Sequence, residues 1–262
     1  PVPFEMTVKE KSTIHFAFDS PTDIETVISD YVSHIQDFLT LAMRVTVPIG
    51  LYATMTGDIG GPGNIDGDGN RRIRVYYPPA VSSDVTSVLP EWHRMLFRFA
   101  DIVENVGLYV QTWFARSEII RTITPSLFAH RYFPTVYTEV EFIDYARALE
   151  SYHRAISQER DTHYKDRVAD VLGRVAEIDE RVVSDVKSTA ELTKNTRNYL
   201  THRNPQQRDR AANGSELRLL TTRLELVLEI CLLLEMGMAP DLIREIVTNQ
   251  RQIGRRRAIL SG

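Results

Sequence analysis

The residues best suited to acid–base and phosphate chemistry lie in one short segment, KNTRNYLTHRNP, at positions 194–205. On a helix, Asn198 and His202 are four residues apart and share a face, and Arg197 lies about 100° around the axis from Asn198. Pro205 ends such a helix, which leaves His202 in the last turn, where solvent or substrate can reach it. The segment therefore predicts an exposed polar flank that carries an arginine, an amide and an imidazole.

These side chains suit the cleavage of RNA without a metal ion. The imidazole of His202 can move a proton, while the guanidinium of Arg197 holds a phosphate and its growing negative charge. The 2′-hydroxyl of RNA is the nucleophile in that reaction, so neither a protein nucleophile nor a metal is required. A hydrogen-bonded pair at a helix end and a degenerate, inactive site are the competing interpretations.

Spacing alone does not distinguish these interpretations, because the chain contains 26 arginines and 7 histidines. Arg147 and His153 form a second pair of similar spacing, which we interpret as ordinary helix surface. Glu150 and Arg154 lie four residues apart on one predicted helix face. They either form a plain ion pair or buttress the site, and His153 between them is expected to pack inside the bundle.

Other patterns of chemically active residues are weak. Asp66 to Asn70, with the sequence DGDGN, resembles the first half of a calcium loop, but Arg71 and Tyr77 stand where glycine and glutamate are needed, so a hairpin loop is favoured. The sequence has no phosphate-binding glycine motif, no H-E-x-x-H and no G-x-S-x-G. We therefore expect no cofactor and no metal site.

Composition indicates an ordinary globular chain of 262 residues, with 31 basic and 35 acidic side chains and a formal charge of −4. Since the net charge is negative, nucleic-acid binding would depend on a local patch. Cys231 is the single cysteine, which excludes a disulfide framework. No secretory signal and no membrane-spanning run is present, so a cytoplasmic protein is expected. The chain starts at proline and enters strand-like sequence, which suggests a fragment of a longer protein.

Residues 1–85 are expected to form an α+β domain, the C-terminal part of a larger β-rich region. Residues 13–18 alternate as a strand does, and Ser20 to Asp23 can cap a helix that runs from Ile24 to Ala42. Strands are predicted at 45–54, with an edge position because of Pro48, and at 71–79, on either side of a glycine-dense loop.

Residues 90–262 are expected to form an all-α bundle, because the hydrophobic period there is 3.6. The predicted helices are 92–113, 142–156, 168–178, a fourth whose last part covers 190–199, the buried 216–236 and a short last helix from Pro240. Gly237 is expected to end the buried helix. The protein is therefore predicted to be mainly α-helical, with a domain boundary near residues 80–90.

The segment RNYLTHRNP resembles the R-x(4–6)-H signature of HEPN domains, which are helical modules of RNases. The helix FIDYARALESYHR, about 45 residues upstream, is similar to the first helix of ApeA-like HEPN domains of bacterial anti-phage defence. The piece from Asp23 to Met55 resembles the end of the β-rich N-terminal region in that family. Arg203, directly after the histidine, and the short N-terminal region depart from the family pattern.

The resemblance implies an HEPN-type endoribonuclease of an abortive-infection system that leaves a 2′,3′-cyclic phosphate. It implies that Arg197 stabilises the phosphate, that His202 is the acid or base, and that Asn198 orients the pair. The implied partners are an RNA substrate, with transfer RNA among the candidates, a second copy that forms a homodimer or higher oligomer, and a phage-derived activator, with no membrane. The alternatives are a non-catalytic helical module that binds nucleic acid or a partner protein, and a purely structural dimerisation module.

Overall fold

The computed structural model describes residues 14–20, 22–47, 51–55, 64–65, 71–75, 94–132, 137–157, 161–249 and 259. The calcium-like loop at 66–70, the boundary at 80–90 and nearly all of the tail after Asn249 lie outside these ranges. Within them, no helix has the length and apolar character needed to cross a membrane.

The first helical stretch follows the sequence prediction closely but contains an irregular segment. It comprises α1 (Ile24–Thr26), the π-helical η1 (Val27–Val32) and α2 (Ser33–Met43). The Asp23 carboxylate caps its start by accepting the backbone N–H groups of Glu25 at 2.9 Å and Thr26 at 3.2 Å. In the π-helical segment the Ser33 hydroxyl donates to the Ile28 carbonyl at 2.8 Å. The predicted helix and its cap are therefore confirmed, whereas the π-helical turn was not predicted.

Three short strands follow, β1 (Leu51–Met55), β2 (Asn64–Ile65) and β3 (Arg71–Val75). They pair antiparallel in the order β1-β3-β2, with Leu51 opposite Val75 and Asn64 opposite Arg72. The strand predicted at 45–54 does not include residues 45–47, which have no regular structure. Whether this region forms an α+β domain of its own stays a prediction.

The predicted strand at 13–18 is wrong, because the described residues 14–18 have no regular structure. The alternation there serves aromatic packing instead. Phe16 and Phe18 make edge-to-face contacts with Tyr31, with centroid distances of 5.8 and 5.0 Å, and Phe16 also contacts Phe114. The alternation of apolar residues at 14–18 therefore belongs to a segment that packs on helices and is not part of a sheet.

The single helix predicted at 92–113 is also wrong. The structure has α3 (Phe99–Ile102) and α4 (Val106–Ala115), followed by α5 (Ser117–Ile120) and α6 (Thr124–Tyr132). Arg98 is extended and binds the Asp101 side chain through its own N–H at 2.7 Å, so the helix starts only at Phe99. A turn bonded from the Asn105 N–H to the Ile102 carbonyl then separates α3 from α4.

The remaining helices confirm the sequence prediction. They are α7 (Thr138–Ile156), α8 (Tyr164–Ile178), α9 (Val186–His202), α10 (Gly214–Glu235) and α11 (Pro240–Asn249), with the 3₁₀ helix η3 (Pro205–Arg210) between α9 and α10. Helix α10 is the buried centre, since residues 226–233 are all at most 1% exposed. Gly237 follows it with φ +80°, a conformation that favours glycine.

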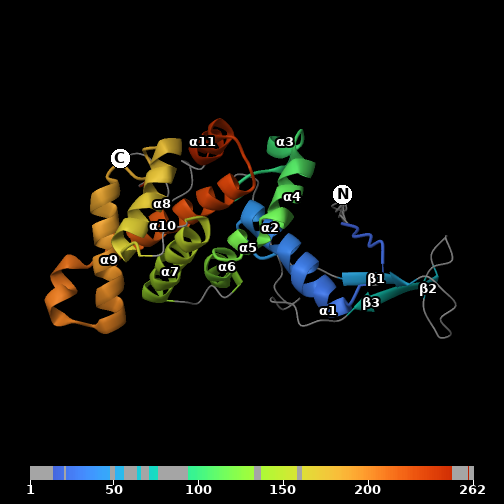
Figure 1. The fold of residues 1–262 in the computed structure, drawn as a ribbon, viewed down its shortest axis with the longest axis horizontal. Helices are drawn as coiled ribbons and strands as arrows, with labels where there is room; N and C mark the ends of the chain where they lie inside the picture. The colour runs from blue at the N-terminus through green and yellow to red at the C-terminus, as the bar shows by residue number, and fades with distance from the viewer. Residues whose placement is uncertain are drawn as a thin grey trace, which may run out of the picture.

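One hydrophobic core extends from α2 to α11. Helix α2 packs on the bundle, where Trp113 of α4 donates its indole N–H to the His34 carbonyl at 3.0 Å. Burial lowers the pKa of His34, and its Nε2 lies 2.9 Å from the Trp113 carbonyl. In Figure 1 the strands lie at one end of the long axis and α9 at the other, with α10 between them. The prediction of a mainly helical protein is confirmed.

Candidate functional site

Helix α9 carries the predicted motif and is fixed by its buried face. The Asp185 carboxylate caps its start by accepting the Ser188 N–H at 2.9 Å. Thr193 and Thr196 are fully buried, and the Thr196 hydroxyl oxygen accepts the backbone N–H of Ala212 at 2.9 Å. This bond ties α9 to the segment before α10, so the motif residues on the other faces of α9 have a rigid support.

Arg197 lies between an acid and an aromatic ring that come from two other helices. Its Nη2 atom is 3.7 Å from Oε2 of Glu150 on α7. Its guanidinium carbon lies 4.7 Å from the ring centroid of Tyr164, the first residue of α8, which is a cation–π distance. The side chain is 37% exposed. Arg197 is thus held in position while part of its guanidinium stays open to a ligand.

Glu150 and Tyr164 are themselves anchored. Glu150 also accepts a hydrogen bond from Nη2 of Arg154 at 2.8 Å, so one carboxylate serves two arginines. The Tyr164 hydroxyl donates to the Ala146 carbonyl of α7 at 3.2 Å. Burial raises the pKa of Tyr164, and the opposing charge of Arg197 does not cancel this effect. A neutral, fixed phenol therefore presents its face to Arg197.

Asn198 and His202 lie where the sequence places them, on the open side of α9. Asn198 is half-buried, and His202 is exposed in the last turn. Within the described part of the chain, neither side chain makes a hydrogen bond, and no hydrogen bond joins His202 to Arg197. Arg203 follows in the left-handed region, with φ 52° and ψ 29°, and its N–H donates to the Tyr199 carbonyl at 2.7 Å. This turn ends the helix immediately after the imidazole.

The structure therefore brings Arg197, Glu150 and Arg154 together. Asn198 and His202 lie on the same helix as Arg197 and have no hydrogen-bond partner among the described residues. The Glu150–Arg154 pair is a real i,i+4 contact, as the spacing predicts. Sequence reasoning missed Tyr164. The only available signal was a tyrosine at the start of a predicted helix, and its role depends on how α8 crosses α9.

The alternative histidine at position 153 has a structural role. It is 4% exposed, and its Nε2 atom lies 3.0 Å from the Asp170 carboxylate. Its Nδ1 atom accepts a hydrogen bond from buried Arg167 at 3.2 Å. The prediction that His153 packs in the bundle is confirmed, and the interpretation of the Arg147 and His153 pair as helix surface is wrong for His153. Arg147 does lie exposed on the surface, where it is paired with Asp144.

No group of three or more His, Cys, Asp or Glu side chains within the described ranges could hold a metal ion. The single cysteine, Cys231, is buried in α10, and burial raises the pKa of its thiol to about 12. It therefore stays protonated and is a poor nucleophile.

The helical bundle carries the R-x4-H spacing, from Arg197 to His202, at the C-terminal end of α9. The family model for Apea-like HEPN matches residues 143–242, which contain Glu150, Arg197 and His202. The model for ApeA N-terminal domain 1 matches residues 1–113, which include α2 and most of α4. The chain therefore belongs to the ApeA-like HEPN proteins. No curated protein and no solved structure matches it. Membership suggests a nuclease-type protein of anti-phage defence.

Proposed function

We propose that this protein is a metal-independent endoribonuclease of a bacterial anti-phage, abortive-infection system. The observation that carries the proposal is the placement of Arg197. Its guanidinium is fixed by Glu150 and Tyr164 while the side chain stays partly exposed, and the same helix presents an exposed His202 that makes no hydrogen bond within the described ranges. RNA cleavage by its own 2′-hydroxyl needs a cation that holds the phosphate and groups that move protons, and α9 of one chain supplies one such cation and one such imidazole.

In the proposed reaction a base removes the proton of the 2′-hydroxyl, and the 2′-oxygen attacks the adjacent phosphorus. The bond from phosphorus to the 5′-oxygen breaks, and an acid protonates that oxygen. The products are a 2′,3′-cyclic phosphate and a 5′-hydroxyl. Arg197 holds the non-bridging oxygens and stabilises their charge, Asn198 orients the pair, and His202 is the acid or the base.

We further propose that two copies pair so that two R-x4-H motifs face one another. Helix α9, which carries His202, lies at one end of the long axis of the molecule (Figure 1). A single chain supplies one motif imidazole, whereas the reaction uses both an acid and a base. A second copy would supply the other group. The proposed partners are thus RNA, with transfer RNA among the candidates, a second protomer and a phage-derived activator, in the cytoplasm.

The test is incubation of the purified protein with bulk cellular RNA in excess EDTA. We expect cleavage, with products that end in a 2′,3′-cyclic phosphate. Replacing one general acid or base costs about 10²- to 10⁴-fold in rate, so His202→Ala should abolish most of this cleavage, and Arg197→Ala should do the same. Both side chains are partly or fully exposed, so both variants should fold.

The matched controls are His15→Ala and Arg147→Ala, which remove an exposed histidine and an exposed arginine away from α9. Both should cleave as the wild type does. Cleavage that survives His202→Ala and Arg197→Ala would contradict the proposal. RNA binding without cleavage, also in the presence of a phage lysate, would instead support a non-catalytic interaction module.

A further inference from the structure

Most arginines in the described part of the chain are paired with a carboxylate. Examples on the surface are Arg98 with Asp101, Arg147 with Asp144, and Arg244 with Asp241, each at 2.6 Å and three residues apart. Among the arginines whose side chains the structure describes, those that form neither an ion pair nor a side-chain hydrogen bond all come after the R-x4-H motif in the chain. They are Arg203, Arg208, Arg210, Arg218 and Arg223.

Three of these form what we call the arginine strip: Arg203, Arg208 and Arg210. Arg203 is the left-handed residue that ends α9, and the other two lie on η3, which packs against α9. All three are exposed, and Asp209, between the last two, pairs with neither. A cation without a carboxylate partner does not have to give up an ion pair when it binds a phosphate. The strip is therefore ready for an anionic ligand.

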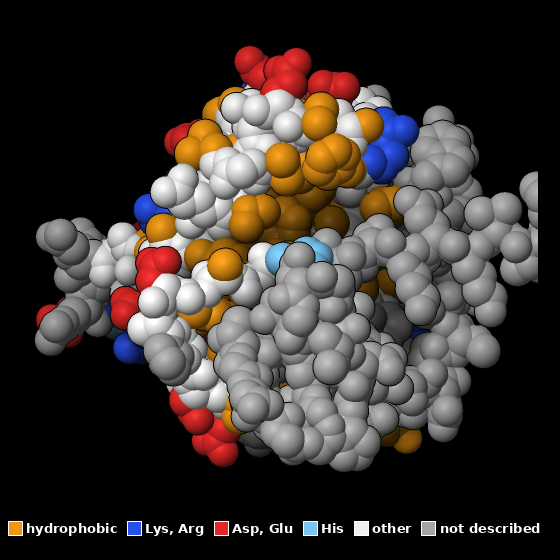
Figure 2. Space-filling view, turned by 90° about the vertical axis from the view of Figure 1, so that its right-hand side faces the viewer, with side chains coloured by type: hydrophobic (Ala, Val, Ile, Leu, Met, Phe, Trp, Pro, Cys, Tyr) orange, Lys and Arg blue, Asp and Glu red, His pale blue; other side chains and the backbone are white. Residues whose placement is uncertain are grey.

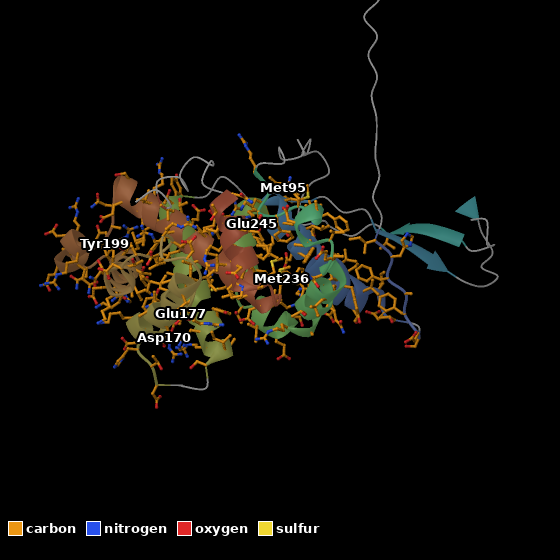
Figure 3. All side chains as sticks on the ribbon, turned by 90° about the horizontal axis from the view of Figure 1, so that it is seen from above. Met95, Asp170, Glu177, Tyr199, Met236 and Glu245 are labelled. Atoms are coloured by element: carbon orange, nitrogen blue, oxygen red, sulfur yellow. The ribbon has the colours of Figure 1, made fainter. Side chains whose placement is uncertain are left out.

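An aromatic side chain lies next to the strip. The guanidinium carbon of Arg203 is 5.8 Å from the ring centroid of Tyr199, which is half-buried and precedes His202 by three residues. Figure 3 shows Tyr199 at the end of the molecule away from the strands, among side chains tipped with nitrogen. Arginines interleaved with an aromatic ring are typical of surfaces that bind single-stranded nucleic acid, since the ring stacks on an unpaired base.

We infer that the arginine strip binds the backbone phosphates of single-stranded RNA on one side of the scissile bond, with Tyr199 stacking on an unpaired base. This inference rests on the proposed function, because the strip continues from the same helix end that presents His202. RNA is favoured over an acidic protein because an arginine fork matches a phosphate in two hydrogen bonds, and because the strip adjoins a candidate phosphate-cleaving site.

The experiment measures binding without cleavage. The probe is a short, unstructured, fluorescently labelled 2′-O-methyl oligoribonucleotide, which lacks the 2′-hydroxyl nucleophile, and the readout is fluorescence anisotropy at a series of salt concentrations. The test variant is Arg203→Gly, Arg208→Gln and Arg210→Gln combined. For a single strand the slope of log K against log salt is about −0.7 per phosphate contact, so three lost contacts should make the slope shallower by about 2. We expect affinity to fall roughly 10- to 100-fold near physiological salt.

The matched control combines Arg98→Gln, Arg147→Gln and Arg244→Gln. It removes the same charge but takes arginines that are already paired. It should keep affinity within about threefold and leave the salt slope unchanged, since net charge acts only weakly at a distance in salt. Tyr199→Leu should lower affinity for the single strand while leaving the salt slope intact.

Equal losses in the test and control variants, or equal binding of a duplex probe, would overturn the inference. So would a strip variant that binds the probe as the wild type does, which is the outcome expected if an acidic protein is the ligand. The two proposals fail separately. Probe binding that depends on the strip, without cleavage of ordinary RNA, refutes the nuclease alone, whereas cleavage with a dispensable strip refutes this inference alone.

Discussion

Two helices of this protein end in the same unusual way and use the side chain at that point for opposite purposes. Arg44 ends α2 and Arg203 ends α9, and these are the non-glycine residues with positive φ in the described part of the chain, at 56° and 52°. The left-handed position normally favours glycine or asparagine. Both helices therefore place an arginine where its backbone is strained by about 1 kcal/mol or more.

The environments of the two guanidinium groups differ completely. Arg44 is 10% exposed and binds the fully buried Glu229 of α10 in two hydrogen bonds, from Nε at 3.0 Å and Nη2 at 2.7 Å. Arg131 of α6 donates to the same carboxylate at 2.5 Å. Arg203 is exposed and forms no ion pair among the described residues. The left-handed turn at the end of α2 places Arg44 in an ion pair that holds the fold together. The same turn at the end of α9 leaves Arg203 exposed next to His202 in the chain.

The surfaces at the two ends of the molecule differ as well. Figure 2 looks at the end that carries the strands, where hydrophobic side chains gather in the middle of the face beside a histidine. Among the described residues, the large apolar side chains that are exposed include Phe99 on α3 and Leu108 on α4. The other end carries the arginine strip. The α9 end of the molecule therefore exposes cationic side chains, whereas the end that carries α2 and α4 exposes apolar ones.

The largest effect should come from Arg44→Gly. The glycine relieves the backbone strain, but the fully buried Glu229 loses one of the two arginines that bind it in the described part of the chain. Removing one partner of a buried pair costs about 3–5 kcal/mol, so after the gain in strain the free energy of unfolding should fall by about 3 kcal/mol. Urea denaturation measures it. A change in the free energy of unfolding below about 1 kcal/mol would show that Glu229 does not depend on Arg44, and it would refute the contrast between Arg44 and Arg203.

The second effect concerns Asp37, on the same helix as Arg44. Burial raises the pKa of its carboxyl from 3.8 to about 6, although the hydrogen bond from Tyr132 and the charge of Arg121 oppose the rise. The folded state then holds a proton that the unfolded state has lost. Stability from this group is present below about pH 4 and is lost as the pH rises to about 6.

We therefore expect the free energy of unfolding of the wild type to fall by about 2 kcal/mol across that pH range through Asp37. Asp37→Asn should remove this part of the slope and exceed the wild type in stability at neutral pH. Tyr132→Phe deletes the hydroxyl that donates to the carboxylate at 3.1 Å, so it should extend the slope to higher pH. Identical pH profiles for Asp37→Asn and the wild type would refute the assignment.

Two regions of the chain also differ in how well their helices can be predicted from the sequence. The helices from α7 to α11 can be predicted from the hydrophobic period, because they are long and because Gly237 and Pro240 mark clearly where α10 ends and α11 begins. The region from 94 to 132 does not, because the side-chain cap formed by Arg98 and Asp101 starts a new helix inside an uninterrupted hydrophobic pattern. Short-range bonds of this kind override periodicity and leave little trace in composition.

The candidate site shows the same division. Asn198, His202, Glu150 and Arg154 could be placed from sequence because each pair lies on one helix. The contacts of Arg197 with Glu150 and Tyr164 could not be predicted, because they depend on how α7, α8 and α9 cross. The left-handed arginines could not be predicted either, because sequence rules place glycine at such positions. What the sequence predicts is the local geometry of each helix, and what it misses are the contacts between helices.

The smallest effect on stability, and the sharpest test of the comparison, is Arg203→Gly. The substitution relieves the same backbone strain as Arg44→Gly but breaks no ion pair, so the free energy of unfolding should stay unchanged or rise by up to about 1 kcal/mol. Binding of the single-stranded probe should nevertheless weaken, because one phosphate contact is lost, by roughly three- to fivefold near physiological salt. Urea denaturation and anisotropy on the same preparation check both. A variant that gains stability while it loses affinity would mean that Arg203 is retained for a ligand at a cost to the fold. A variant that loses stability would mean that Arg203, like Arg44, is structural.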